Sequence, residues 1–382
     1  MQYLIDNKKS IAVFTANQKG GIVQLAVEVF RQISKLGYSV YCYLPDDVTG
    51  LDFDDVNEKR ILWYKKIKPQ NKLESAKFLI NPCQYGGRDI IQSIYEYNIG
   101  VFWAVDSEIL TSSIINTINK EIYSLITVHD VVFHPSNDES FKTKILRKFY
   151  LAWRKKSMLN SDKIIVLSEE SMKKFNGKYH KYFDKTQLLT LGAHITSLKA
   201  DRPIEVLYGK KQYFLFFGRF EKYKGLDVLA NIFSQPEARG YNLIVAGDGE
   251  IDNSVQVKMR ESKNINLIKR YITDAEMVWL IKNSLAVILP YSEASQSGVI
   301  PISYYFGVPV VVSNIAGLTQ FVENRKSGLI CNGIEDYIDS LKVLANDIQN
   351  EKYSTEAKEY YRNNMDWTMN IKKVLNTFME EG

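Results

Sequence analysis

The sequence predicts an α/β protein with two doubly wound parallel sheets, and three observations support this prediction. Short, unbroken apolar runs such as 10–15 and 285–289 are typical of strands that are buried on both faces of a parallel sheet. Segments with helical spacing, such as 21–35 and 274–282, alternate with these runs in both halves of the chain. The chain has 382 residues, which is too long for one ordinary hydrophobic core, so two domains are expected.

The expected strands follow one another in a regular order. In the first half they are 10–15, 39–44, 61–64, 100–104, 124–129, 163–167 and 187–191. In the second half they are 213–218, 241–246, 265–269, 285–289, 309–313 and 328–331. The loop region between these two sets, at about 192–210, is the best candidate for a linker.

Composition narrows the class of protein. The formal net charge of +5 hints at acidic ligands but is too small to indicate nucleic-acid binding. Cys42, Cys83 and Cys331 are far apart and form no metal-binding pair, which fits a reducing, cytosolic setting. We expect no secretory signal, and two prolines and a glycine interrupt the longest apolar stretch, 299–312, so no membrane span is expected.

The segment 290–299 (PYSEASQSGV) combines a polar loop with a helix that should begin near Ser297. It follows the strand expected at 285–289, and open α/β folds bind ligands at this end of their strands. Exposed backbone N–H groups and the helix dipole favour an anion there, such as a diphosphate. The alternative is an ordinary helix cap, which is a commoner feature.

A second strand, loop and helix follow in 217–225 (FGRFEKYKG). Arg219 offers a planar fork for phosphate oxygens, and Lys224 adds a point charge near the start of the helix. The alternative is a solvated basic loop, and Lys222 is expected to be only that. A glycine turn at 246–250 (AGDGE) follows another expected strand.

The segment 17–22 (NQKGGI) follows the first expected strand. Gly20 and Gly21 would let the backbone approach a ligand closely. The segment matches neither GxGxxG nor a P-loop, so neither NAD binding nor nucleotide hydrolysis is favoured. The alternative is a tight turn.

His129, in 127–135 (TVHDVVFHP), ends an expected strand and should project into the cleft between the domains. It could donate a hydrogen bond there to a sugar hydroxyl or a phosphate. A zinc site is a poor fit because no further ligands are near in sequence. The alternative is a structural histidine with its hydrogen bonds satisfied.

In this order and spacing, the segments resemble the retaining GT-B glycosyltransferases of glycosyltransferase family 4, also called glycosyl transferases group 1. The resemblance covers essentially the whole chain and is strongest over 216–332. The motifs that carry it are Gly218-Arg219 with Lys224-Gly225, Gly247-Asp248-Gly249, Ala316-Gly317 and the run from Glu293 to Val299.

The resemblance implies a GT-B fold, in which two Rossmann-like domains face a central cleft. It implies an acceptor-side domain over 1–195, a donor-binding domain over 196–364, and a helix at 365–382 that returns to the first domain. The implied activity is hexosyl transfer (EC 2.4) from a UDP- or GDP-linked sugar to a saccharide or lipid-linked acceptor, in surface polysaccharide or glycoconjugate assembly. A cytoplasmic, metal-independent enzyme without a cofactor is expected.

The resemblance also implies roles for individual residues. Arg219 and Lys224 would hold the donor diphosphate and neutralise the charge that develops on the leaving nucleotide. Glu293 would meet the donor sugar and His129 the transferred sugar, and these two complete the expected catalytic set. The implied donor-binding residues are Gly20, Gly21, Gly218, Arg219, Lys224, Gly247, Glu293, Ser295, Gln296, Ser297, Gly298 and Val299.

One departure from the family pattern leaves alternatives open. Many members have a second glutamate, about one turn into the helix, that binds the ribose hydroxyls. Here Ile302 occupies that position, and no carboxylate lies between Glu293 and Glu323. A non-catalytic GT-B partner subunit therefore remains an alternative, and so does a nucleotide-sugar epimerase, although the acidic cluster expected of an epimerase is not found.

The run 52–55 (DFDD) has the spacing of the Asp-x-Asp motif of metal-dependent glycosyltransferases. It lies in a polar loop between early strands, away from the diphosphate segments, and acidic loop clusters are usually solvated. We therefore predict no metal site.

The helix expected at 141–158 (FKTKILRKFYLAWRKKSM) carries seven Lys or Arg residues interleaved with apolar and aromatic ones. Such a helix can lie on an anionic membrane surface, which would suit a lipid-linked acceptor. The alternative is an ordinary helix that packs its aromatic residues inward beneath a solvated basic face.

Overall fold

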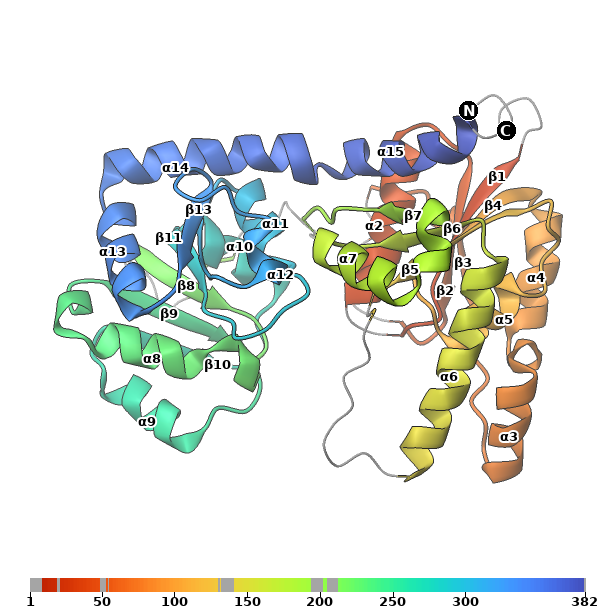
Figure 1. The fold of residues 1–382 in the computed structure, drawn as a ribbon, viewed down its shortest axis with the longest axis horizontal. Coiled ribbons are helices and arrows are strands. Elements are labelled where there is room, and N and C mark those ends of the chain that lie inside the picture. Colours follow the sequence, from red (N-terminus) through yellow and green to blue (C-terminus); the bar gives the residue numbers. More distant parts are fainter. Residues whose placement is uncertain are drawn as a thin grey trace. The chain divides into compact units, whose positions relative to one another are not determined.

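The computed structural model describes residues 9–18, 21–48, 53, 55–129, 131, 141–193, 202–204 and 212–380. The chain forms two compact units (Figure 1). Unit 1 is Met1–Thr190 together with Trp367–Gly382, and unit 2 is Leu191–Asp366. Most of the expected linker, 192–210, lies outside the described residues.

Unit 1 contains a seven-stranded parallel sheet with strand order β3-β2-β1-β4-β5-β6-β7. The strands are β1 Ser10–Phe14, β2 Val40–Pro45, β3 Ile61–Tyr64, β4 Ile99–Ala104, β5 Tyr123–Val128, β6 Lys163–Val166 and β7 Thr186–Leu188. The α-helices are α2 Gly21–Lys35, α3 Lys72–Ile80, α4 Gly87–Glu96, α5 Ile109–Ile115, α6 Phe141–Asn160, α7 Glu169–Lys178 and α15 Trp367–Glu380. Short 3₁₀ turns are η1 Glu58–Arg60, η2 Pro82–Gln84 and η3 His180–Lys185.

Unit 2 contains a six-stranded parallel sheet with strand order β10-β9-β8-β11-β12-β13. The strands are β8 Tyr213–Phe217, β9 Asn242–Gly247, β10 Ile265–Lys269, β11 Ser284–Leu289, β12 Val310–Ser313 and β13 Gly328–Cys331. The α-helices are α8 Leu226–Ser234, α9 Asn253–Glu261, α10 Asp274–Lys282, α11 Val299–Tyr305, α12 Ala316–Thr319, α13 Ile334–Leu344 and α14 Asp347–Tyr360. Short turns are η5 Lys222–Lys224, η6 Pro236–Ala238 and the π-helical η7 Tyr361–Met365.

Both sheets are doubly wound, as predicted. In each sheet the strand order reverses once, between β1 and β4 in unit 1 and between β8 and β11 in unit 2. Helices flank each sheet (Figure 1), and β1, β4 and β6 are buried along their whole length. Apart from Ser10 and Lys163 at their first positions, these strands are apolar because both of their faces are covered. The reversal in strand order creates a switch point, where ligands bind in folds of this kind.

The helix expected at 141–158 is α6, which continues to Asn160. No helix within the described residues combines the length and apolar character that crossing a membrane requires.

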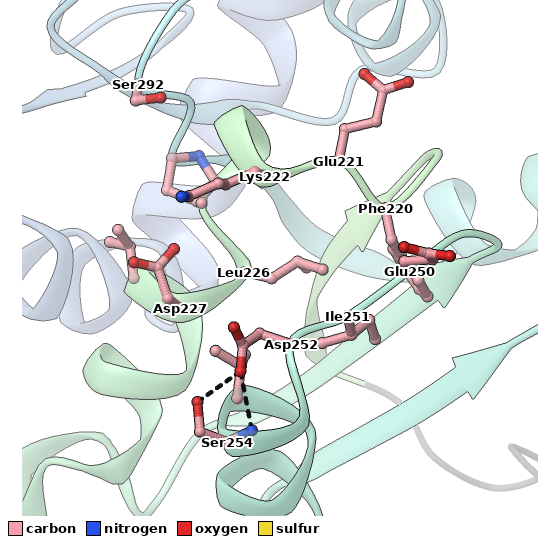
Figure 2. Close-up of a pocket in the computed structure, with 14 residues that line it drawn as sticks. Phe220, Glu221, Lys222, Leu226, Asp227, Glu250, Ile251, Asp252, Ser254 and Ser292 are labelled. Atoms are coloured by element: carbon pink, nitrogen blue, oxygen red, sulfur yellow. Dashed lines mark hydrogen bonds between the residues drawn. The ribbon is translucent and has the colours of Figure 1, made fainter. Parts of the chain in front are cut away.

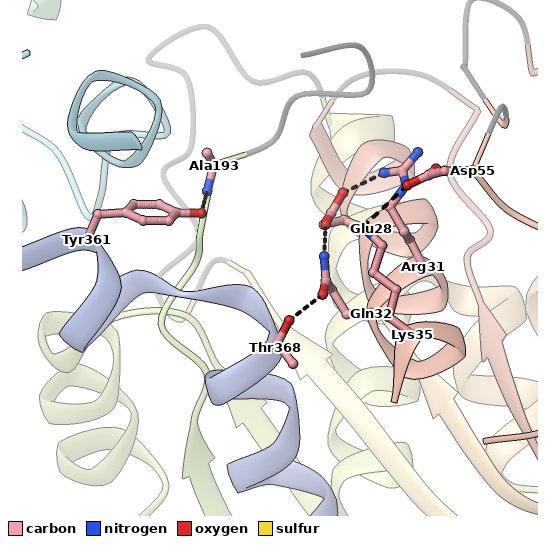
Figure 3. A network of polar contacts seen from close by, with 8 residues as sticks. All are labelled: Glu28, Arg31, Gln32, Lys35, Asp55, Ala193, Tyr361 and Thr368. Atoms are coloured by element: carbon pink, nitrogen blue, oxygen red, sulfur yellow. Dashed lines mark hydrogen bonds and ion pairs between the residues drawn. The ribbon is translucent and has the colours of Figure 1, made fainter. Parts of the chain in front are cut away.

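A buried polar network joins α15 to α2 inside unit 1 (Figure 3). The Glu28 carboxylate accepts hydrogen bonds from Arg31 Nη1 and from Gln32 Nε2, both at 2.6 Å. Thr368 Oγ1 donates to Gln32 Oε1 at 2.8 Å. Glu28, Arg31 and Gln32 are all buried, so their polar groups need hydrogen-bond partners within the protein.

Replacing Arg31 with alanine should destabilise the protein by about 3–5 kcal/mol, because the buried Glu28 carboxylate loses its cation. Lys35→Ala is the matched control. Lys35 is an exposed cation that pairs with Asp55 at 3.3 Å, and its loss should cost about 0–1 kcal/mol. Urea unfolding followed by circular dichroism measures both variants. Equally small losses would contradict a structural role for the network.

Candidate functional site

The segments predicted to bind the donor gather at one edge of the unit 2 sheet. Strands β9, β8, β11 and β12 are parallel neighbours, so their carboxyl ends meet at this edge. Segments 218–225, 247–250, 290–299 and 314–317 follow β8, β9, β11 and β12 respectively. We call this edge the donor edge. It includes the switch point between β8 and β11.

Two glycines allow the loops of the donor edge to touch. Gly225 has a φ of +72°, and a Cβ at this position would overlap the carbonyl oxygen of Pro290. A Cβ on Gly247 would overlap the carbonyl oxygen of Gly218. Any larger residue would separate the loops or strain the backbone, so both contacts require glycine.

Lys224 bridges the loop after β8 and the loop after β11. Its Nζ lies 3.1 Å from the point that a Cβ on Gly218 would occupy. The same ammonium lies 6.0 Å from the ring centroid of Tyr223 and 5.7 Å from that of Tyr291. The two rings pack edge to face with their centroids 5.9 Å apart. Cation–π attraction and this aromatic pair therefore hold the ammonium in place.

Arg219 lies in the same loop as Lys224. Its Nη2 pairs with the Glu221 carboxylate at 3.3 Å, and its side chain is 81% exposed. An exposed pair contributes little to stability, so the guanidinium can exchange Glu221 for phosphate oxygens. Burial lowers the pKa of Lys224, the Glu221 carboxylate opposes this shift, and the charge on Arg219 lowers the pKa further. An anion bound between the two cations would relieve their repulsion.

The start of α11 also belongs to the donor edge. The Ser297 side chain is buried and hydrogen-bonds to the Tyr291 hydroxyl. The Val299 N–H donates to Ser297 Oγ at 3.4 Å. The helix begins at Val299, two residues later than expected, and the exposed Gly298 is its cap. A Cβ on Gly298 would meet no atom within 4 Å, so this cap faces open space.

Glu293 is exposed in the loop after β11, and Ser295 and Gln296 are half-buried. Burial raises the pKa of the Tyr223 hydroxyl to about 12, with contributions from its hydrogen bond to Glu221 and from the charge on Glu293. The Glu293 carboxylate is therefore near the aromatic pair that holds Lys224.

Two predicted residues lie in unit 1 at the carboxyl ends of strands or just beyond them. Gly21 is exposed and begins α2, whereas Gly20 lies outside the described residues. His129 follows β5, and its Nε2 is 2.8 Å from the carbonyl oxygen of Val105. If His129 is a structural histidine, a hydrogen bond of this kind is expected. Because Nε2 makes this bond, it is not the atom that would meet a sugar.

Ile302 belongs to the core of unit 2 and is only 7% exposed. The position of the second family glutamate is therefore on the buried side of α11. Any ribose hydroxyls would have to be bound by a different group.

A cavity of about 810 Å³ is lined in part by loops of the donor edge, including Phe220, Gly225 and Ser292 (Figure 2). Its charged lining residues are Glu221, Lys222, Asp227, Glu250 and Asp252. Arg219 and Lys224 are not among the residues that line it. Because four carboxylates would repel a diphosphate, we do not assign the donor phosphates to this cavity.

The rival Asp-x-Asp motif is only partly described, since Asp52 and Asp54 lie outside the described residues. Asp55 accepts a hydrogen bond from Arg31 Nε at 2.6 Å and pairs with Lys35 at 3.3 Å. Partial burial would raise the pKa of Asp55, but these two cations lower it overall. In the part of the chain that the structure describes, no three His, Cys, Asp or Glu side chains could hold a metal ion together. Asp55 therefore has a structural role.

The sequence motifs did not point to Tyr223 and Tyr291, which position Lys224. They also did not point to Asp106 and Glu108, a pair of carboxylates that follows β4 at the switch point of unit 1. The available signal for the second pair was two acidic residues directly after a buried apolar run.

Comparison with known sequences points to one enzyme class. The sequence model of the family described as "Glycosyl transferases group 1" matches residues 211–347. A curated Klebsiella pneumoniae protein, described as an uncharacterized 41.2 kDa protein in the cps region, is 25% identical over 118 residues. That match covers 31% of this chain and 32% of the relative, about a third of the relative's length.

Solved structures match nearly the whole chain. A glycosyltransferase from Rickettsia africae ESF-5 matches with a TM-score of 0.70 and 18% identity, over 97% of this chain and 98% of that chain. HepE from Anabaena, solved in complex with UDP and glucose, matches with a TM-score of 0.65 and 14% identity, over 97% and 99% of the two chains. These likenesses show that the fold is GT-B. Together with the family match over 211–347, they support a GT-B glycosyltransferase at the level of the general class.

Proposed function

We propose that this protein is a retaining glycosyltransferase that moves a sugar from a UDP- or GDP-linked donor to a saccharide or lipid-linked acceptor, in surface polysaccharide or glycoconjugate assembly. The observation that carries the proposal is the convergence of Arg219, Lys224 and the start of α11 at the donor edge. The family match over 211–347 supports the reaction class, and the UDP complex of HepE supports a nucleotide-linked donor. The relative from a cps region supports polysaccharide assembly.

In this proposal the two cations act on the leaving group. Negative charge grows on the diphosphate oxygens as their bond to the anomeric carbon breaks. The Arg219 fork binds two of these oxygens, and Lys224, already fixed over its tyrosine rings, adds a point charge. The bound anion raises the pKa of Lys224 against the effect of burial, so the lysine stays charged.

The other predicted residues shape the donor site. The N–H groups of Gly298 and Val299 approach the diphosphate, and Glu293 binds the donor sugar. Ser297 acts through Tyr291, because its side chain is buried against that hydroxyl. The other residues that we propose to contact the donor are Gly20, Gly21, Gly218, Gly247, Ser295 and Gln296. His129 would lie near the transferred sugar.

We also propose a cytoplasmic location with contact to the inner face of the cell membrane through 141–158. The exposed side chains of α6 include the apolar Ile145, Leu146 and Phe149 and the basic Lys144 and Lys148. Apolar and basic side chains on one helix fit an anionic lipid surface.

The helix α3 extends this surface. Trp153 Nε1 in α6 donates a hydrogen bond to the Leu79 carbonyl oxygen at 2.8 Å, so the two helices are tied together. Ile80 at the end of α3 is 74% exposed, Leu73 is 66% exposed, and Lys77 is exposed between them. The helices α6 and α3, which this hydrogen bond joins, therefore both expose apolar and basic side chains that suit an anionic lipid surface.

One of the nucleotides UDP, GDP and ADP should raise the melting temperature by a few degrees, since a ligand at a hundred times its Kd adds about 2.7 kcal/mol. Arg219→Ala and Lys224→Ala should each weaken binding, because each removes a charged contact of about 1.5–3 kcal/mol. Gly298→Ala should fold normally but bind more weakly, because its Cβ fills the open space at the helix cap. Lys222→Ala, an exposed neighbour, should bind like the wild type. Differential scanning fluorimetry measures all four variants.

The products of a sugar-nucleotide panel separate the remaining alternatives. The enzyme should slowly release the nucleoside diphosphate by hydrolysis, and NMR should find the sugar released with the anomeric configuration of the donor. A non-catalytic subunit would leave every donor intact, and an epimerase would change another centre of the sugar. No thermal shift with any nucleotide would reject the proposal.

Lys144→Glu combined with Lys148→Glu should weaken co-sedimentation with phosphatidylcholine vesicles that contain phosphatidylglycerol. Each basic residue near an anionic surface contributes about 1 kcal/mol, so the double reversal should reduce binding at least tenfold. The control is Lys372→Glu combined with Lys373→Glu, two exposed lysines of α15. Unchanged sedimentation of the first variant would discard the membrane contact.

A further inference from the structure

The loop after β8 carries a carboxylate, Glu221, between the groups that we propose for the donor. The backbone of Glu221 is extended (φ −134°, ψ 146°), and in extended backbone the side chains two residues apart lie on the same side. Glu221 Oε1 pairs with Arg219 Nη2 at 3.3 Å. The Tyr223 hydroxyl donates a hydrogen bond to the same carboxylate.

The charge on Glu221 also acts on Lys224. Burial lowers the pKa of Lys224, and the Glu221 carboxylate opposes this shift, whereas the charge on Arg219 adds to it. One carboxylate therefore offsets the repulsion between the two cations of the donor edge. In the free protein, Glu221 performs the electrostatic task that the donor diphosphate performs in the proposed complex.

A carboxylate and a phosphate compete for the same partners. Both accept two parallel hydrogen bonds from a guanidinium, and both accept from a phenol hydroxyl. The two anions also repel each other at contact distance, so they cannot hold Arg219 together. A diphosphate that binds Arg219 must therefore displace Glu221.

Glu221 has room to turn away from Arg219. Its side chain is 33% exposed, and it lines the cavity of about 810 Å³ together with the exposed Lys222 (Figure 2). The displaced carboxylate therefore reaches water or the ammonium of Lys222. It does not become a buried charge without a partner, so its displacement costs little.

We infer that Glu221 is a built-in competitor of the donor diphosphate: it holds Arg219 in the free protein, yields it to the diphosphate, and takes it back when the nucleotide leaves. This inference deepens the proposed function and rests on it. Glu221 acts through Arg219, so it is a positioning residue. After sugar transfer the nucleoside diphosphate is a product, and a resident carboxylate that weakens its binding assists its release.

Calorimetric titration of the full chain with pyrophosphate, and with the nucleoside diphosphate that raises its melting temperature, tests this inference. Glu221→Gln should bind both ligands about two- to fivefold more tightly, because the competing ion pair is a partly exposed one. Glu221→Ala should give the same gain. Glu250→Gln is the matched control. Glu250 is an exposed carboxylate that lines the same cavity, and its replacement should leave the affinity unchanged.

A double-mutant comparison separates competition for Arg219 from a general change in charge. In an Arg219→Ala background, Glu221→Gln should lose most of its effect, because no guanidinium is left for the carboxylate to hold. In the hydrolysis assay, the inhibition constant of the released nucleoside diphosphate should fall about two- to fivefold in Glu221→Gln.

The outcomes distinguish this inference from the proposed function. If a nucleotide binds the wild type but Glu221→Gln binds it no more tightly, this inference alone is overturned. An equal gain in Glu250→Gln, or the same gain with and without Arg219, overturns it too. If neither pyrophosphate nor any nucleotide binds the wild type, the proposed function fails as well.

Discussion

The donor edge depends on one constraint, the contact between loop backbones at the switch point of unit 2. Gly225 can lie against the Pro290 carbonyl only because it has no side chain. Lys224, the preceding residue, is thereby brought to the ring of Tyr291, which lies in a segment far along the chain. The contact sets the spacing between the cations that follow β8 and the helix start that follows β11. In the proposed function, this spacing lets a donor diphosphate meet both groups at once.

The two units share a topology but use their switch points differently. The donor edge of unit 2 presents Arg219 and Lys224, and burial, assisted by the charge on Arg219, lowers the pKa of the lysine. The switch point of unit 1 presents Asp106, whose buried carboxylate accepts hydrogen bonds, beside Glu108, whose pKa burial and the charge on Asp106 raise to about 7. Each site therefore carries unfavourable electrostatics in the free protein. Groups held in place before the ligand arrives need no reorganisation during reaction, which is a general source of catalytic power.

The fold and the sequence motifs of the candidate site could be predicted because both depend on local sequence. Apolar runs such as 285–289 identify buried strands, and the motif around Arg219 and Lys224 lies within one strand, loop and helix. The edge-to-face pair of Tyr223 and Tyr291 could not be predicted, since it joins segments that are distant in sequence. The start of α11 was predicted near Ser297, and the helix begins two residues later, at Val299. Ser297 has the chemistry of a cap, but tertiary packing buries its side chain against Tyr291.

The position of α15 has a consequence for synthesis of the protein on the ribosome. Thr368 completes the buried network of α2, and Ile371 and Val374 are fully buried, so unit 1 needs a helix that is translated after all of unit 2. At about 5–20 residues per second, the nascent first unit waits roughly ten to thirty seconds with its docking groove for α15 uncovered. Unit 2 is continuous and can fold during that interval. The last helix to emerge from the ribosome therefore completes unit 1. Chaperones that shield exposed apolar surface would act mainly before α15 has packed against unit 1.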